Sequence, residues 1–103
     1  MEYLEECKKA MEWLAEKDNT IFLGQTVAYE GSPIYRSLTG ILREKKIEMP
    51  IAEDMQMGIS IGLALEGFVP ISIYPRIDFL LCAINQLVNH LDKVEEMSHG
   101  EFR

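Results

Sequence analysis

The sequence has few cysteines, no long apolar run and no excess of positive charge. Its 103 residues include two cysteines, Cys7 and Cys82, whose separation matches no metal-binding or redox motif. Both lie on predicted helix faces, so we expect buried free thiols in a reducing cytosol. No apolar run approaches the ~20 residues that span a bilayer, and the acidic N-terminus lacks the apolar region of a signal peptide. We therefore expect a soluble, cytoplasmic protein without membrane partners.

The charge balance excludes another class of partner. The chain carries 17 acidic and 10 basic residues, a net charge of -7, which argues against nucleic acid or an anionic membrane as the main partner. Apolar residues make up 48% of the chain, so a packed core is expected. The length suits one small domain.

Hydrophobic periodicity predicts helices alternating with strands. Such alternation predicts an α/β fold of three layers, in which helices cover both faces of a mostly parallel sheet. We expect Asp78 to cap the last helix, and its apolar residues 80, 84, 87, 88, 91 and 94 to be buried. The predicted elements are helix 2–17, strand 20–24, helix 34–42, strand 45–49, helix 54–66 ended by Gly67, strand 68–74 and helix 79–97.

Three strands make a small sheet for this architecture, and the sequence stops where a further strand is expected. We therefore interpret residues 1–103 as a single partial domain: a fragment, a truncated gene product or a part that needs a partner.

Glu53 is the first candidate site residue, because it lies where a strand should end and a helix begin. Ligands of open α/β sheets bind at the carboxyl ends of the strands. A carboxylate in the first helical turn also stabilises the helix by ~0.3–1 kcal/mol, so the residues alone leave both roles open. Gly58 and Gly62 follow as a G-x-x-x-G pair. Each glycine costs a helix about 1 kcal/mol, which close packing on the chain's own sheet or on another subunit must offset.

The spacing Glu53-x4-Gly58-Ile59-x-x-Gly62 resembles a signature of thiamine-diphosphate enzymes, in their transketolase-like pyrimidine-binding domain. The surrounding sequence resembles the N-terminal part of the beta subunit of the decarboxylating component of 2-oxo acid dehydrogenases, of the pyruvate and branched-chain type. The segments that carry this resemblance run in order through the chain: Phe22-Leu23-Gly24-Gln25-Thr26-Val27, Pro50-Ile51-Ala52-Glu53, residues 62–71, residues 83–89 and residues 97–102.

The resemblance implies a thiamine-diphosphate-binding fold and a cofactor-activating role for Glu53. In this family the matching glutamate hydrogen-bonds the N1′ nitrogen of the cofactor's aminopyrimidine and favours the imino tautomer, which removes the C2 proton of the thiazolium. The diphosphate and its Mg²⁺ are held by a different domain, on a partner alpha-type chain, and this sequence has no Gly-Asp-Gly motif followed by Asn. In the family, the helix that matches the one carrying Gly58 and Gly62 meets other helices at a subunit interface, so the resemblance also implies an oligomer.

Two positions depart from the family pattern. Arg76 aligns with an aromatic residue that packs on the pyrimidine; a guanidinium can stack on a ring, but a solvent-facing Arg76 is the alternative. Gln25 replaces a residue that is usually acidic. We expect His90 and His99 to lie on the surface, because the family's proton-relay histidine lies beyond this segment.

Three functional hypotheses follow. The first is the pyrimidine-binding part of a thiamine-diphosphate-dependent 2-oxo acid dehydrogenase or transketolase-like enzyme, with Glu53 and Arg76 contacting the cofactor. The second is a non-catalytic, truncated interaction module that keeps the fold. The third is an unrelated flavodoxin-like domain, whose phosphate loop would have to be residues 25–33.

Overall fold

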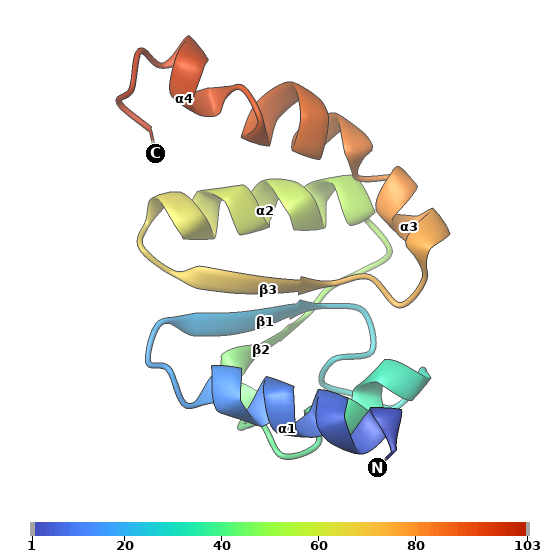
Figure 1. Cartoon of the computed structure of the whole chain (residues 1–103). Coiled ribbons are helices and arrows are strands. Elements are labelled where there is room, and N and C mark those ends of the chain that lie inside the picture. The colour runs from blue at the N-terminus through green and yellow to red at the C-terminus, as the bar shows by residue number, and fades with distance from the viewer. Residues whose placement is uncertain (1, 103) are drawn as a thin grey trace.

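The computed structural model describes residues 2–102 and contains a parallel sheet with helices on both faces (Figure 1). The strand order is β2-β1-β3, and both neighbours run parallel to β1. The α/β prediction is therefore confirmed. In the register of the sheet, Phe22 lies opposite Lys46 and Ile71, and Ile21 lies opposite Pro70. The strands are β1 (Thr20–Gly24), β2 (Lys46–Glu48) and β3 (Val69–Ile73).

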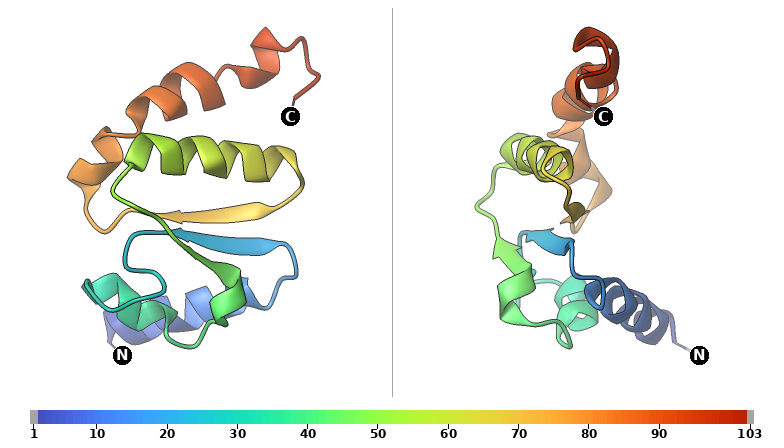
Figure 2. Two further views of the ribbon diagram at one scale, coloured as in Figure 1. Left: turned by 180° about the vertical axis from the view of Figure 1, so that it is seen from behind. Right: turned by 90° about the vertical axis from the view of Figure 1, so that its left-hand side faces the viewer.

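The two long helices cover opposite faces of the sheet. Helix α1 (Tyr3–Ala15) lies on one face and helix α2 (Glu53–Leu65) on the other, as the end-on view in Figure 2 shows. Because β1 is the central strand and is covered on both faces, its residues Phe22 and Leu23 are both fully buried although they point in opposite directions. The main hydrophobic cluster consists of Phe22, Val27, Leu38, Ile41 and Ile73, with Met11, Leu14 and Ala15 packed against it.

The connections are shorter and tighter than predicted. Instead of a helix over 34–42, a 3₁₀ segment η1 (Pro33–Leu38) follows β1, and a second short one, η2 (Arg43–Lys45), precedes β2. Helix α2 begins at Glu53, one residue earlier than expected. Its predicted end is confirmed, because Gly67 adopts the left-handed conformation with φ of 94° that glycine tolerates.

The prediction of one long helix over 79–97 is wrong. The segment folds as α3 (Ile77–Leu81), a π-helical stretch η3 (Gln86–Leu91) and α4 (Val94–Met97). Asp78 is not the cap, since the N-cap position of α3 is Arg76 and no side chain caps it. Figure 1 shows that η3 and α4 lie on the side of α2 away from the sheet, whereas α3 lies beside the beginning of α2.

That placement also overturns the predicted burial of the last helix. Among described residues 77–102, Ala83 alone is buried, whereas Ile84, Val88 and Leu91 remain exposed. The spacing of these apolar residues is typical of a helix. However, α2 covers only one side of this segment, so the other side stays exposed. The expectation of buried cysteines is also wrong, because Cys82 is exposed on this segment and Cys7 is only half-buried on α1. In residues 2–102 no helix is long and apolar enough to cross a membrane.

Candidate functional site

Glu53 is the first residue of α2 and lies at the edge where β1 and β3 end. Its side chain is half-buried. The amide Nε2 of Gln25, just beyond β1, donates a long hydrogen bond of 3.4 Å to Glu53 Oε1. Among residues 2–102 the other oxygen, Oε2, has no hydrogen-bond donor. One carboxylate oxygen is thus held by the protein, while the other is available to a ligand.

Gln56 fixes the start of α2 on the sheet. Its side chain is 1% exposed. Its Nε2 donates to Ile73 O and Ser72 Oγ, both at 3.0 Å, and lies 3.3 Å from Leu23 O. These acceptors lie on the final residues of β1 and β3, so one amide joins both strand ends to the first turn of α2. Sequence analysis missed this residue, although a polar side chain within an apolar helical pattern was a usable signal.

Glu48, the last residue of β2, organises the loop after β1. Its carboxylate accepts hydrogen bonds from three successive amides, Thr26 N at 2.8 Å, Val27 N at 3.1 Å and Ala28 N at 3.0 Å. Thr26 adopts a left-handed φ of 56°, which turns these amides toward one point. The loop is thereby fixed with Gln25 beside Glu53. The flavodoxin-like hypothesis loses support, because a phosphate loop here would need amides that Glu48 occupies.

Tyr74 places an aromatic side chain close to Glu53, a contact that the sequence pattern did not predict. It follows β3 directly, and its hydroxyl donates to the backbone oxygen of Glu53 at 3.4 Å. Burial raises the pKa of Tyr74 above its ordinary value of 10.0; the Ser72 hydroxyl opposes this shift, and the negative charges of Glu53 and Asp54 add to it. The phenol is therefore a protonated hydrogen-bond donor at neutral pH.

Arg76, the predicted ring contact, is engaged elsewhere. Its Nη2 pairs with Asp78 Oδ2 at 3.1 Å, and its guanidinium lies 5.3 Å from the centre of the Phe79 ring. The Arg76 side chain is 69% exposed. Asp78 and Phe79 thus hold the guanidinium in a solvated turn at the start of α3.

Gly58 and Gly62 lie on α2 in different surroundings. A Cβ at Gly58 would be in ordinary contact with Gln86 of η3, whose Cδ lies 3.7 Å away, whereas a Cβ at Gly62 would meet no described atom within 4 Å. Packing within the described chain therefore does not require glycine at position 62. The predicted subunit interface at these two glycines stays a prediction.

Gly62→Ala is expected to stabilise the chain by about 0.5–1 kcal/mol, because alanine lowers the backbone entropy of the unfolded chain and meets no clash here. Urea unfolding of both proteins measures the difference. The matched control is Gly67→Ala, which should be destabilising because φ at Gly67 is 94°. A loss of stability in Gly62→Ala would show that its surroundings are closed.

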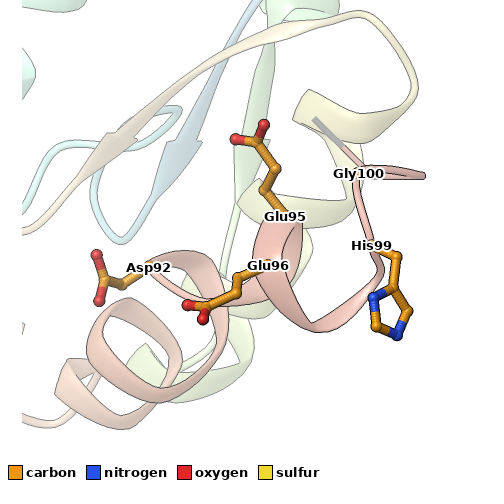
Figure 3. Close-up of a pocket in the computed structure, with 5 residues that line it drawn as sticks. All are labelled: Asp92, Glu95, Glu96, His99 and Gly100. Atoms are coloured by element: carbon orange, nitrogen blue, oxygen red, sulfur yellow. The ribbon is translucent and has the colours of Figure 1, made fainter.

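The remaining ionisable side chains form no comparable site. Figure 3 shows a shallow hollow near α4 lined by Asp92, Glu95, Glu96 and His99, whose side chains point in different directions. Within residues 2–102 no three His, Cys, Asp or Glu side chains are grouped to hold a metal ion. His90 and His99 are exposed, as expected, and His90 Nδ1 lies 2.7 Å from Gln86 Oε1.

Comparison with known proteins identifies relatives along most of the chain. The 2-oxoisovalerate dehydrogenase subunit beta of Bacillus subtilis is 28% identical over 99% of this chain. The 3-methyl-2-oxobutanoate dehydrogenase subunit beta of Mycobacterium tuberculosis is 33% identical over 85% of it. The pyruvate dehydrogenase E1 component subunit beta of Gracilaria tenuistipitata is 34% identical over 85% of it.

The chain is a homologue of dehydrogenase E1 beta subunits. The recognition made from the sequence motifs is thereby confirmed. This beta-subunit homologue spans about a quarter to a third of the length of those relatives, from 26% to 32%. No protein-family model matches it.

Proposed function

We propose that this chain supplies the pyrimidine-binding half of a thiamine-diphosphate site in a 2-oxo acid dehydrogenase. The observation that carries the proposal is the half-buried Glu53 carboxylate at the strand edge, with one oxygen bonded to Gln25 and the other without a donor among residues 2–102. A carboxylate of this kind can hydrogen-bond a ring nitrogen and exchange a proton with it. When bound, thiamine diphosphate would supply the carbon nucleophile for decarboxylation of a 2-oxo acid.

The described residues fit the pyrimidine end of the cofactor and not its diphosphate end. Glu53, Gln25 and Tyr74 offer a carboxylate, an amide and a phenol close together. The sequence has no Gly-Asp-Gly motif followed by Asn, which in the family holds the diphosphate. We therefore assign the diphosphate and Mg²⁺ to a partner alpha-type subunit, and residues 1–103 to one partial domain that completes the site by association.

The test is an NMR titration of the ¹⁵N-labelled 103-residue chain with 4-amino-2-methylpyrimidine, the cofactor's ring without its diphosphate. We expect weak binding, with chemical-shift changes centred on Gln25, Glu53 and Tyr74. Glu53→Ala should weaken the affinity by about tenfold or more, because a charge-assisted hydrogen bond contributes ~1.5–3 kcal/mol. Asp54→Ala is the matched control: it removes the adjacent acid, which Gln86 contacts instead, and should leave the affinity unchanged.

Equal affinities of wild type and Glu53→Ala would contradict the proposal, as would shifts centred on another face. So would tight binding of complete thiamine diphosphate with Mg²⁺ by the chain alone, because the proposal gives the diphosphate to a partner.

A second candidate function, the non-catalytic interaction module, is favoured by one observation. Several large apolar side chains on the outer segment, residues 77–102, are more than half exposed, namely Ile77, Leu81 and Met97. A surface of this kind is typical of protein contacts. The two candidates differ in one result, because a pure interaction module would not bind the pyrimidine through Glu53.

A further inference from the structure

We propose that Tyr74, rather than Arg76, is the side chain that contacts the ring bound at Glu53. This inference rests on the proposed function and adds a binding residue to it. The family motif that the sequence resembles places the ring contact at position 76. The geometry points instead to the residue at the end of β3, two positions earlier.

Tyr74 lies beside the first turn of α2. Its hydroxyl oxygen lies 3.4 Å from the backbone oxygen of Glu53, so the phenol reaches the first turn of α2 from β3. The Glu53 side chain meets Gln25, which follows β1. Glu53 is therefore contacted by an amide from one strand end and by a phenol hydroxyl from the neighbouring one.

Tyr74 is also available to a ligand. A hydroxyl hydrogen bond is usually 2.7–2.8 Å long, so its bond of 3.4 Å to Glu53 O is weak and can be exchanged at little cost. The side chain is only partly buried, which leaves part of the ring accessible. A partly buried tyrosine presents an apolar face together with a hydrogen-bond donor, the combination that suits a heteroaromatic ring.

Arg76, by contrast, is held within its own turn by two interactions. The ion pair with Asp78 at 3.1 Å and the contact with the Phe79 ring at 5.3 Å both act on the guanidinium. To stack on a ligand at Glu53, Arg76 would have to give up both interactions. Tyr74 would give up at most one long hydrogen bond to Glu53 O and its contact with the Ser72 hydroxyl.

The experiment repeats the titration with 4-amino-2-methylpyrimidine on three further variants. Tyr74→Leu removes the ring and should weaken binding about tenfold, the scale of stacking between an aromatic side chain and a base. Tyr74→Phe keeps the ring and should bind within about threefold of wild type, because only the hydroxyl contact is lost. Arg76→Leu, the matched substitution at the aligned position, should change the affinity by less than about twofold.

A measurement on the wild-type chain keeps the test independent of how the variants fold. We expect intermolecular nuclear Overhauser effects between the methyl group of the probe and the ring protons of Tyr74. Circular dichroism of Tyr74→Leu verifies that any loss of binding occurs in a folded protein.

The possible results separate this inference from the proposed function. If Arg76→Leu weakens binding and Tyr74→Leu does not, or if the Overhauser effects reach Phe79 and not Tyr74, the inference is overturned. If Glu53→Ala abolishes binding while Tyr74→Leu binds as wild type, the proposed function stands and only the role of Tyr74 fails. If the wild-type chain does not bind the probe, both fail.

Discussion

Glu53→Gln is expected to lower kcat by about 10²–10⁴-fold in an enzyme assembled from this chain and an alpha-type subunit, the range that positioned proton transfer contributes. Glutamine keeps a hydrogen-bonding oxygen where Glu53 meets Gln25, but it cannot exchange a proton with the ring nitrogen. The affinity for thiamine diphosphate should therefore change much less than turnover. Steady-state kinetics measure kcat, and calorimetric titration of the cofactor measures its Kd.

Asp54→Asn is the control for this experiment. It replaces the neighbouring carboxylate of the same helical turn by the corresponding amide. Asp54 contacts Gln86 of η3 instead of Gln25. Its turnover should stay within about twofold of wild type. Wild-type turnover in Glu53→Gln would remove Glu53 from the chemistry and would favour the interaction module.

Gln56→Leu is expected to lower the free energy of unfolding by about 2–4 kcal/mol. Leucine is close to glutamine in volume but donates no hydrogen bond, so the acceptors on Ile73, Ser72 and Leu23 lose a donor inside the protein, where water cannot replace it. Urea unfolding followed by circular dichroism gives the difference.

The matched control for packing is Met57→Leu. Met57 is the next residue of α2 and is also buried, but it makes no side-chain hydrogen bond in the described chain, and a volume-conserving exchange costs less than about 1.5 kcal/mol. Equal stabilities of Gln56→Leu and Met57→Leu would mean that the amide is not the anchor of α2. If the amide is the anchor, Gln56→Leu should also broaden the NMR signals of residues 53–56.

The sheet and its two covering helices could be predicted because their signals are local. Strand β1 is a short apolar run that follows Asn19 and ends at Gly24, and α2 is followed by Gly67, whose conformation other residues rarely adopt. The segment after β3 could not be predicted in the same way. Its apolar periodicity predicts a helix but does not contain the information that α2, rather than a sheet, would be its neighbour.

The candidate site could likewise be predicted only where its signals are local. Glu53 was found from its place between a predicted strand and a predicted helix, and its spacing to Gly58 and Gly62 then carried the family resemblance; both are patterns within a short stretch of sequence. Its contacts with Gln25 and Tyr74 join positions separated by 28 and 21 residues. Such contacts depend on strand order and on the register of β1 with β3, and neither can be read from a single sequence. Glu48 was missed for this reason as well, since its acceptor role exists only once the loop after β1 folds over β2.

Pro70 in β3 has a consequence for how this molecule behaves in concentrated solution. In the described chain β3 is an outer strand of the sheet, and Val69 N–H already donates inward to Asn19 O. Alternate residues of a strand direct their amides to opposite sides, so position 70 faces outward. Proline has no amide hydrogen, and an outer strand without a donor at this point is a poor template for a strand from another molecule. The opposite outer strand, β2, is only three residues long. Both outer strands of the sheet are therefore poor templates for fibrous aggregation, even though apolar side chains of the outer segment remain exposed.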